Sequence, residues 1–339
     1  MNIYENQSLK AHNTFGIDCQ TRYFAKFQSE QDAIELLKRC TSPLLILGGG
    51  SNILLTQDFP GTVLKNEIKG IEIIEESDIH TTVKVGGGEV WHDFVLWSIE
   101  QGLSGIENLS LIPGSVGAAP MQNIGAYGVE ISAVFQRLDA ISIVQQEKRV
   151  FNNPQCQFGY RSSIFKGDLK GKYVITYVYF RLNKKPNNNT SYGAILSELS
   201  KMGVKNPSVQ DISTAVINIR ERKLPNPRDI GNSGSFFKNP IIPIEKFFEV
   251  QKKYPHIVGY TVSDSQKKVA AGWLIEQAGW KGYRKGDAGI HENHALVLVN
   301  YGTANGMELM QLSKEVQTSV WNMFGIALEA EVNIISHQM

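Results

Sequence analysis

IPGSVGAAPMQNIGAYG at residues 112–128 and ILGGGSNILL at residues 46–55 are two glycine-rich segments that contain no charged residue. Residues without bulky side chains let several backbone N–H groups converge on a pyrophosphate, which they bind through oriented dipoles. Both segments therefore predict phosphate-binding loops. Tight turns in a glycine-rich fold are the alternative interpretation.

The glycines do not fit a Rossmann dinucleotide-binding turn. That fingerprint requires glycine at the first, third and sixth positions of a turn that opens a helix. The sixth position is Ile53 after Gly48 and Gly50, and it is Trp91 after Gly86 and Gly88. The sequence thus favours phosphate-binding loops of a non-Rossmann kind.

Length and composition indicate a globular protein of two or three domains. The chain has 339 residues, of which 42% are hydrophobic and 20% charged, and a domain usually takes about 150 residues. The formal net charge of +1 argues against a general nucleic-acid or anionic-membrane binder. No run of 18 apolar residues and no apolar leader is present, so a cytoplasmic location without membrane insertion is expected. Three scattered cysteines, Cys19, Cys40 and Cys156, predict neither a disulfide framework nor a thiolate metal site.

Hydrophobic periodicity predicts an α/β N-terminal part. A helix should begin at Ser29, residues 42–55 read as strand, turn and strand, and residues 81–85 predict a strand before a helix that ends at Gly102. Strands should return between residues 138 and 182. Farther on, residues 267–279 and 306–324 predict helices, and residues 294–300 and 327–335 predict strands, the last with Glu329 and Glu331 on one face.

Several clusters of reactive or charged residues have two interpretations each. His291 and His294 are three residues apart, whereas a metalloprotease helix needs a spacing of four, so a metal site is not favoured. Ser235 serves either a turn or catalysis. The basic clusters bind phosphates or lie on a solvated face; they are Arg220, Arg222, Lys223 and Arg228, then Lys267 and Lys268, then Lys281, Arg284 and Lys285 beside Trp280 and Tyr283.

Seven segments together resemble the UDP-N-acetylenolpyruvoylglucosamine reductase (MurB) family of peptidoglycan synthesis. They are ILGGGSNILL, IPGSVGAAPMQNIGAYGVE, FGYRSSIFK, SYG, RERKLPNPRDIGNSGSFFKNP, KKVAAGWLIEQAGWKG and LEAEV. The likeness spans nearly the whole chain, and the SYG segment with Tyr192 is similar to the longer, tyrosine-loop branch of the family. One departure is Asn333, where a relative has arginine.

The resemblance implies an α/β (α+β) protein with a vanillyl-alcohol-oxidase-type (PCMH-like) FAD-binding fold of two subdomains and a C-terminal α+β substrate-binding domain. The expected boundaries are residues 1–66 for the first FAD-binding subdomain, 67–222 for the second, joined by the C-terminal strand 329–339, and 223–328 for the substrate-binding domain. FAD would be bound without a covalent link.

The implied reaction reduces UDP-N-acetyl-3-O-(1-carboxyvinyl)-glucosamine to UDP-N-acetylmuramate, the reaction of an NADP-dependent dehydrogenase. NADPH first reduces FAD; hydride then passes from N5 of the reduced flavin to C3 of the vinyl ether, and a proton passes from Ser235 to C2. Arg161 and Glu331 match the family's residues that stabilise the negative charge on C2 and its carboxylate. Glu331 can do so only as the neutral acid.

The same likeness assigns binding residues. Those expected to bind FAD are Gly48, Gly49, Gly50, Ser51, Asn52, Pro113, Gly114, Ser115, Gly117, Asn123, Gly125, Ala126, Tyr127 and Arg161. Those expected to bind the UDP-sugar are Tyr192, Lys223, Asn239, Tyr260 and Lys268. NADPH and the UDP-sugar would alternate in one cleft of a monomer, with no nucleic-acid, membrane or metal partner. An FAD-dependent oxidase of the same fold and a non-catalytic nucleotide-sugar-binding regulator are the alternatives.

Overall fold

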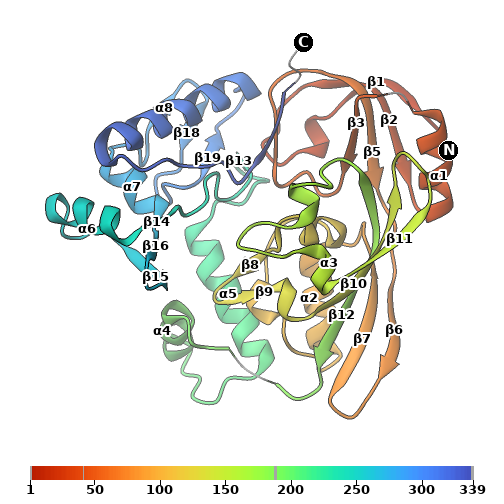
Figure 1. Cartoon of the computed structure of the whole chain (residues 1–339), viewed down its shortest axis with the longest axis horizontal. Helices are drawn as coiled ribbons and strands as arrows, with labels where there is room; N and C mark the ends of the chain where they lie inside the picture. Colours follow the sequence, from red (N-terminus) through yellow and green to blue (C-terminus); the bar gives the residue numbers. More distant parts are fainter. Residues whose placement is uncertain (1, 41, 187–188, 337–339) are drawn as a thin grey trace. The chain divides into compact units, whose positions relative to one another are not determined.

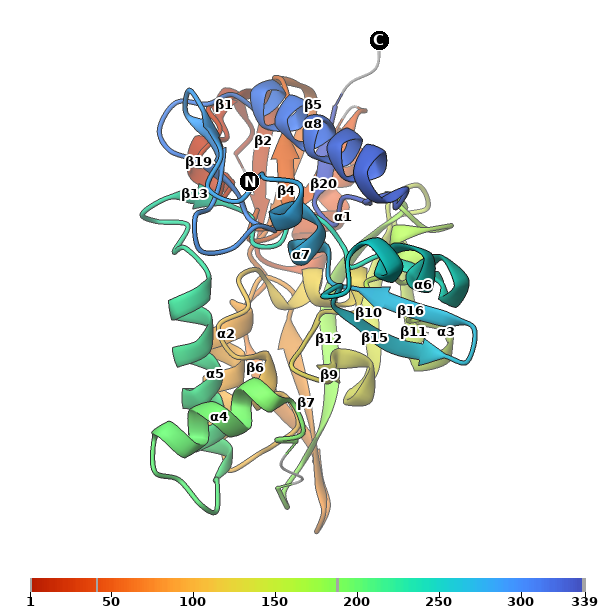
Figure 2. The ribbon, with the colours of Figure 1, turned by 90° about the vertical axis from the view of Figure 1, so that its left-hand side faces the viewer.

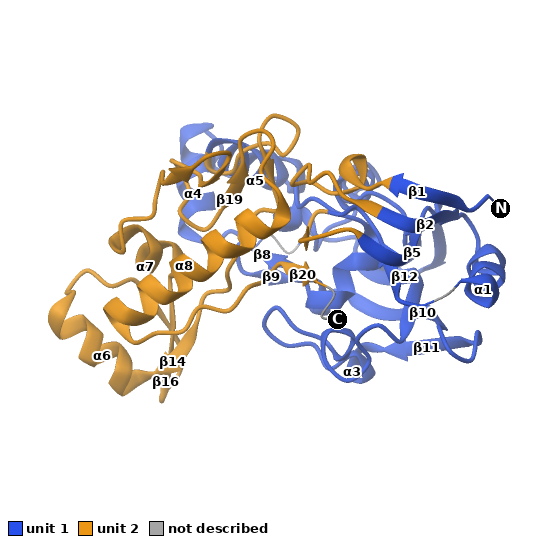
Figure 3. Cartoon of the chain, turned by 90° about the horizontal axis from the view of Figure 1, so that it is seen from above, with its two compact units in different colours: residues 1–7, 21–50, 59–222 blue, residues 8–20, 51–58, 223–339 orange. Residues whose placement is uncertain are grey.

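The computed structural model describes residues 2–40, 42–186 and 189–336, and the chain divides into two compact units (Figure 3). Unit 1 comprises residues 1–7, 21–50 and 59–222, and unit 2 comprises residues 8–20, 51–58 and 223–339. Two short N-terminal stretches therefore belong to the same unit as the C-terminal third. The three-part division expected from the sequence stays a prediction.

A mostly parallel sheet forms one layer of unit 1 (Figure 1). Its strand order is β1 (Tyr4–Ser8), β2 (Gln20–Phe27), β5 (Phe59–Asn66) and β3 (Leu44–Leu47), and β2, β5 and β3 are parallel. Helix α1 (Glu30–Arg39) connects β2 to β3. The Ser29 hydroxyl accepts a hydrogen bond from the Asp32 N–H at 3.0 Å, which confirms the predicted helix start.

A five-stranded antiparallel sheet forms the second layer of unit 1. Its order is β11 (Lys148–Asn152), β10 (Phe135–Ser142), β12 (Tyr173–Asn183), β7 (His80–Gly86) and β6 (Ile71–Glu76). Helix α2 (Trp91–Glu100) packs on it, with the Phe94 and Phe180 ring centroids 5.0 Å apart. The fully buried Trp91 donates its indole N–H to the Leu109 carbonyl at 2.9 Å. These elements confirm the predicted strands and helix.

Short elements and two helices complete unit 1. The short ones are the 3₁₀ helices η2 (Glu107–Leu109), η3 (Val116–Gln122), η4 (Ile131–Ala133) and η5 (Ile164–Lys166), the strands β8 (Gly125–Ala126) and β9 (Val129–Glu130), and α3 (Asn153–Cys156). Helices α4 (Gly193–Lys201) and α5 (Val209–Lys223) lie side by side (Figure 2), where Ile195 and Leu199 pack against Val216 and Ile219.

Unit 2 contains three small sheets. The first has the order β13 (Gly231–Asn232), β19 (Leu298–Asn300), β18 (Ala288–Ile290) and β17 (Arg284–Lys285); the second has β14 (Ile241–Pro243), β16 (Gln266–Val269) and β15 (Gly259–Ser263); and β20 (Asn333–Ile335) pairs in parallel with β4 (Ile53–Leu55). The helices are η1 (Lys10–His12), α6 (Ile244–Lys253), α7 (Ala271–Gln277) and α8 (Gly306–Phe324).

Helix α8 confirms the predicted C-terminal helix. Asn305 and Glu308 form a reciprocal capping box at its start, and Gly325 ends it with a φ of +62°. The predicted apolar stripe is buried; it consists of Leu309, Leu312, Val316, Val320 and Phe324.

Two predicted elements differ in the structure. Lys267 and Lys268 belong to strand β16, and the helix predicted from residue 267 begins only at Ala271. β16 is hydrogen-bonded on both edges, to β14 and to β15, so sheet pairing overrides the local helical pattern. The strand predicted over 327–335 is regular only at Asn333–Ile335. Residues 337–339, the end of the predicted terminal strand, lie outside the described residues.

No helix within the described ranges is long and apolar enough to cross a membrane.

Replacing Gly306 with alanine should destabilise unit 2. A Cβ at Gly306 would lie 1.8 Å from the Leu55 carbonyl oxygen, so α8 would have to move away from β4, at a cost of about 2 kcal/mol or more. Gly272→Ala is the matched control, because its Cβ would meet Leu296 at an ordinary 3.6 Å within a helix that alanine favours. Urea unfolding of both variants tests this; equal midpoints would contradict the close contact.

Candidate active site

The two glycine-rich segments of the sequence meet backbone to backbone in unit 1. A Cβ built on Gly49 would lie 2.9 Å from the Cα of Gly114, and one built on Gly48 would lie 2.3 Å from the Ser115 Oγ. The Lys65 ammonium on β5 donates to the Gly48 carbonyl at 3.2 Å. The absence of side chains is therefore what allows the two predicted cofactor-binding segments to touch.

The third glycine cluster, residues 86–88, supports the second segment. The Gly117 N–H donates to the Gly87 carbonyl and the Val116 N–H to the Glu89 carbonyl, both at 2.9 Å. A Cβ on Gly117 would lie 2.9 Å from the Gly87 carbonyl oxygen. These glycines thus have a structural role that the sequence pattern did not separate from ligand binding.

Ser115 marks the place where these segments have unused hydrogen-bonding capacity. The residue is 6% exposed, and its hydroxyl makes no hydrogen bond within the described part of the chain. Buried hydroxyls nearly always have a partner. A buried hydroxyl without a protein partner, next to a glycine that leaves space, is expected in a loop that binds an anionic ligand. Ser115 and Gly48 therefore fit a bound diphosphate.

Arg161 lies in a tight turn next to the end of the second segment. Gly159 and Ser162 exchange backbone hydrogen bonds at 3.1 Å, and Arg161 has a φ of +52°. A Cβ on Gly125 would lie 3.2 Å from Arg161 Nη1. The Asn123 amide is used internally, since it donates to Glu130 at 2.7 Å and accepts from Ser132 N–H at 3.1 Å. Arg161 is thus held against the backbone of the predicted cofactor loop, and Asn123 shapes that loop.

Two tyrosines from distant segments form an aromatic pair in unit 1. The rings of Tyr127 and Tyr192 meet edge to face with centroids 5.3 Å apart. Tyr127 also packs against the cluster formed by α4 and α5 and hydrogen-bonds Arg220. Burial, more than any nearby charge, raises the pKa of Tyr127 above its usual range. Tyr127 therefore remains a neutral phenol near pH 7.

In unit 2, Ser235 and Glu331 lie on neighbouring extended segments. The Glu331 N–H donates to the Phe236 carbonyl at 2.8 Å, the Lys238 N–H donates to the Glu329 carbonyl at 2.9 Å, and Phe237 forms a bridge with Ala330. One peptide hydrogen bond thereby joins Glu331 to Phe236, the residue after Ser235, although the two lie 95 positions apart in the sequence.

Asn333 has a definite structural role. Its backbone N–H and its side-chain amide both donate to the Asn52 carbonyl, each at 3.0 Å, and the Asn52 amide donates to the Glu331 carbonyl at 3.4 Å. At this position a neutral amide therefore binds the chain at Asn52. The predicted cofactor residue Asn52 is thus fixed by the segment that carries Glu331.

The remaining predicted substrate residues also lie in unit 2. Tyr260 on β15 and Lys268 on β16 are cross-strand partners, and the Asn239 side chain accepts from the Ala271 N–H at 2.9 Å, which caps α7. Tyr260 is half exposed. These residues bring an aromatic ring and an ammonium group to one hairpin. Arg161, Tyr127 and Tyr192 belong to unit 1, so their meeting with Ser235 on one ligand stays a prediction.

His294 is a site neighbour that the sequence pattern did not indicate. Its Nδ1 accepts the Leu296 N–H at 3.3 Å, and the Leu296 carbonyl accepts the Phe236 N–H at 2.7 Å, one residue from Ser235. Burial, the nearby Lys223 and His291 lower the pKa of His294 to about 4. The HENH motif does not predict that His294 lies near the site, because the position of His294 beside Lys223 depends on pairing between distant segments.

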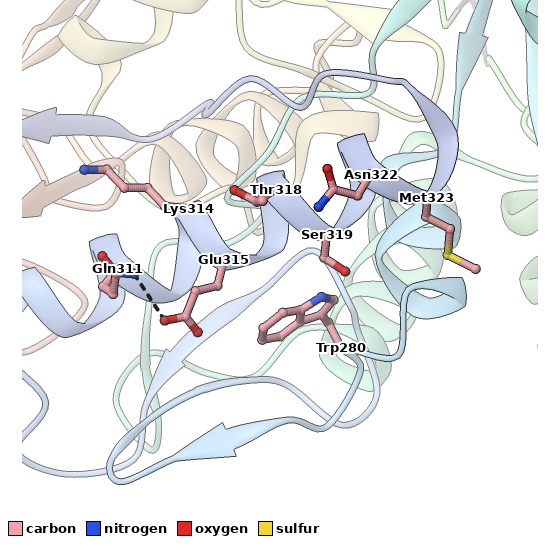
Figure 4. A pocket seen from close by; sticks show the side chains of 8 residues that line it. All are labelled: Trp280, Gln311, Lys314, Glu315, Thr318, Ser319, Asn322 and Met323. Atoms are coloured by element: carbon pink, nitrogen blue, oxygen red, sulfur yellow. Dashed lines mark hydrogen bonds between the residues drawn. The ribbon is translucent and has the colours of Figure 1, made fainter.

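A cavity lies elsewhere in unit 2. It is an open groove of about 660 Å³ along α8, with the Trp280 ring lying beside the helix (Figure 4). It is lined by Trp280, Gln311, Lys314, Glu315, Thr318, Ser319, Asn322 and Met323, none of which is a predicted site residue. The described residues also contain no group of three or more His, Cys, Asp and Glu side chains that could hold a metal.

The neutral state of His294 should make folding stability depend on pH. The folded-state pKa of about 4 lies below the ordinary 6.5, so between these values the unfolded chain binds a proton that the folded chain does not. This stability contribution is complete above pH 6.5 and is lost as the pH falls to about 4, by at most about 3 kcal/mol. His294→Asn, which can still accept the Leu296 N–H, should lack this component in urea unfolding at about pH 7 and pH 4.5. An unchanged pH slope would contradict the assignment.

Comparison with known proteins agrees with this geometry. Residues 226–335 match the model of the UDP-N-acetylenolpyruvoylglucosamine reductase C-terminal domain, and residues 21–150 match an FAD-binding domain. The chain is 52% identical to the UDP-N-acetylenolpyruvoylglucosamine reductase of Flavobacterium johnsoniae and 49% identical to that of Amoebophilus asiaticus; each alignment covers 99% of this chain and all of the relative. The crystal structure of the enzyme (MurB) from Thermus caldophilus superposes with a TM-score of 0.69 at 21% identity, covering 99% of this chain and 98% of that one.

These matches confirm the expected FAD-binding fold with a C-terminal domain. Because relatives about half identical to it align along its whole length, the chain belongs to the UDP-N-acetylenolpyruvoylglucosamine reductase family.

Proposed function

We propose that this protein uses FAD and NADPH to reduce UDP-N-acetyl-3-O-(1-carboxyvinyl)-glucosamine to UDP-N-acetylmuramate, a precursor of peptidoglycan. The observation that carries the proposal is the peptide pairing of Phe236 with Glu331. This hydrogen bond joins the segment that carries the Ser235 hydroxyl to the segment that carries the Glu331 carboxyl group. Both segments lie in unit 2, which contains the residues matched by the family's C-terminal domain.

FAD is held by the glycine segments of unit 1 and the Asn52 loop. The N–H groups of Gly48 to Asn52 and of Gly114 to Gly117 bind the diphosphate, and the Ser115 hydroxyl supplies a hydrogen bond that no described residue takes. Gly125, Ala126, Tyr127 and Arg161 line the flavin. When bound, FAD supplies the hydride that reaches C3 of the vinyl ether.

Arg161, Glu331 and Ser235 complete the chemistry at C2. Hydride addition at C3 places negative charge on C2 and its carboxylate, where the Arg161 guanidinium and the Glu331 carboxyl group stabilise it. The Ser235 hydroxyl then gives its proton to C2. A hydroxyl is a weak acid, so the donor must be well placed; the φ of +68° at Gly234 and the Gly234 N–H bond to Asn232 at 2.9 Å shape the turn that carries it.

The UDP group is bound by Tyr192, Lys223, Asn239, Tyr260 and Lys268, with the lysines on the diphosphate. NADPH also carries a diphosphate and uses the same site in turn, which gives ping-pong kinetics and inhibition by excess substrate. The enzyme works as a monomer in the cytoplasm.

An anaerobic spectroscopic experiment tests the proposed function. The purified protein should show flavin absorption, NADPH should bleach it under nitrogen, and the UDP-enolpyruvyl sugar should restore it. Recolouring only by O2 would indicate an oxidase. Binding of both ligands without any bleaching would indicate a regulator.

Ser235→Ala should slow flavin reoxidation by the UDP-enolpyruvyl sugar by about 100-fold or more, because it removes the proton donor. Flavin reduction by NADPH should remain largely intact, since that half-reaction needs no proton at C2. Stopped-flow measurement of the two half-reactions separates these effects. Ser233→Ala, in the same loop, controls for distortion; equal losses in both variants would argue against the proton-donor role.

Gly48→Ala should weaken FAD binding by about tenfold or more, because its Cβ would lie 2.3 Å from the Ser115 Oγ. Adding Ser115→Ala removes that oxygen and leaves the Ser115 Cβ at 3.4 Å, so the double variant should bind FAD better than Gly48→Ala alone. Titration of the apoprotein with FAD measures the affinities. A double variant weaker than either single one would contradict the contact.

A further inference from the structure

Lys65 is a cation fixed at the carboxyl edge of the parallel sheet, next to the first glycine-rich segment. It is the last residue but one of β5, where its register partners are Leu47 of β3 on one edge and Lys26 of β2 on the other. Its ammonium donates to the Gly48 carbonyl at 3.2 Å. Strand pairing on both edges therefore places the charge of Lys65 at the start of the predicted cofactor loop.

Two other lysines of this region are each neutralised by a glutamate, whereas Lys65 is not. Lys26 forms an ion pair with Glu67 at 2.9 Å, and Lys69 forms one with Glu89 at 3.2 Å. In the part of the chain that the structure describes, no ion pair joins Lys65 to a carboxylate. The hydrogen bond to the Gly48 carbonyl thus holds an ammonium whose charge is not balanced by a paired carboxylate from those residues.

Burial makes this charge unfavourable in the free protein. Desolvation is the largest cause that lowers the pKa of Lys65 below its usual range. The charges of Lys26 and Lys69 lower it further, and the charge of Glu67 opposes them. Lys65 is only partly buried, so a ligand can reach it. An anion bound beside the ammonium would offset the desolvation cost and favour the charged form.

The ammonium lies at the same glycine as a second group with unused hydrogen-bonding capacity. A Cβ on Gly48 would lie 2.3 Å from the Ser115 Oγ, and that hydroxyl has no partner among the described residues. The Gly48 carbonyl occupies only one of the three donors of an ammonium. A partly buried cation and a buried hydroxyl at one glycine are complementary to a ligand that is anionic and accepts hydrogen bonds.

We propose that Lys65 is a diphosphate-binding residue of the cofactor site, whose ammonium supplies the positive charge that the glycine-rich segments lack. The proposal rests on the proposed function and adds a charged side chain to a site otherwise built from peptide N–H groups and one hydroxyl. Neither glycine-rich segment contains a charged residue, whereas the diphosphate of FAD bears negative charge on both of its phosphates. A hydrogen bond from a charged donor to a phosphate oxygen is stronger than one from a neutral peptide.

Lys65→Gln tests the charge apart from the hydrogen bond, because its amide N–H can still donate to the Gly48 carbonyl. Dilution of the holoenzyme, followed by the fluorescence of released FAD, gives the dissociation constant, which should rise by about tenfold or more. Lys26→Gln is the matched control, since it removes the register partner that Glu67 already neutralises; its dissociation constant should change by less than about threefold. Wild-type affinity in Lys65→Gln, or equal losses in both variants, would overturn the proposal.

Salt dependence separates the role of the charge from a structural one. FAD binding by the wild type should weaken between about 50 and 500 mM NaCl, and it should weaken less in Lys65→Gln, because the screened charge has been removed. A merely structural role would lower the affinity and leave the salt dependence unchanged, which would refute the proposal.

Lys65→Arg keeps the test valid if the glutamine variant does not fold. Because it retains the positive charge, it should keep the affinity for FAD within about threefold and the salt dependence of the wild type. Loss of both in Lys65→Arg would contradict the proposal. If the wild-type protein binds no FAD at any salt concentration, it is the proposed function that fails.

Discussion

Close backbone contact between glycines is the constraint on which the rest of unit 1 depends. Gly49 and Gly114 come from segments 65 residues apart in sequence, and they meet at a distance that excludes a Cβ. The contact links the carboxyl end of β3, in the parallel sheet, to η3. Gly87, at the end of β7, supports the same segment from the other layer. Two sheets are thus tied through peptides whose N–H groups can face a ligand, which is how such loops hold phosphates.

Unit 2 also fixes its predicted site residues through backbone hydrogen bonds, although its strands are too short to be stable alone. The Pro- and Gly-rich segment around Ser235 is no regular element, yet Phe236 bonds Leu296 on one side and Glu331 on the other. Leu296 in turn donates to His294. Each peptide in this row uses its N–H or C=O on a different part of the chain, so the positions of Ser235 and Glu331 are fixed by backbone hydrogen bonds rather than by side-chain packing.

Local chemistry explains which parts of the fold could be predicted. The Ser29 cap, the helix ending near Gly102 and the apolar stripe of α8 are encoded within a few residues, and all three were predictable. Lys267 and Lys268 carry a helical pattern but lie in a strand with partners on both edges, which no local pattern reveals. The alternation of residues 327–335 also overstated a strand, because Ala330 pairs with Phe237 only in an isolated bridge and the regular ladder is limited to Asn333–Ile335.

The candidate site was predictable only as far as residues could be matched to a family by motif. The role of His294 next to Lys223, and that of Asn333 on Asn52, depend on contacts between distant segments. The glycine clusters at residues 86–88 and 48–50 have the same composition but different roles. Residues 86–88 support the segment 112–128 through backbone hydrogen bonds, whereas residues 48–50 lie beside the Ser115 hydroxyl, which has no hydrogen-bond partner among the described residues. Composition cannot distinguish a supporting glycine from a ligand-binding one.

The distribution of ion pairs shows how a nearly neutral chain can prepare a local site for anions. Many of its cations are neutralised by protein carboxylates: Arg222 by Glu198, Lys238 by Glu329 and Lys281 by Glu276. No ion pair between Arg220 and a carboxylate is found among the described residues, and burial together with the charge of Arg161 lowers the pKa of Arg220. A net charge of +1 gives no long-range attraction, so affinity for an anion must come from cations placed away from carboxylates. Burial strengthens this effect, because weaker solvent screening makes each unpaired charge act more strongly on a bound ligand.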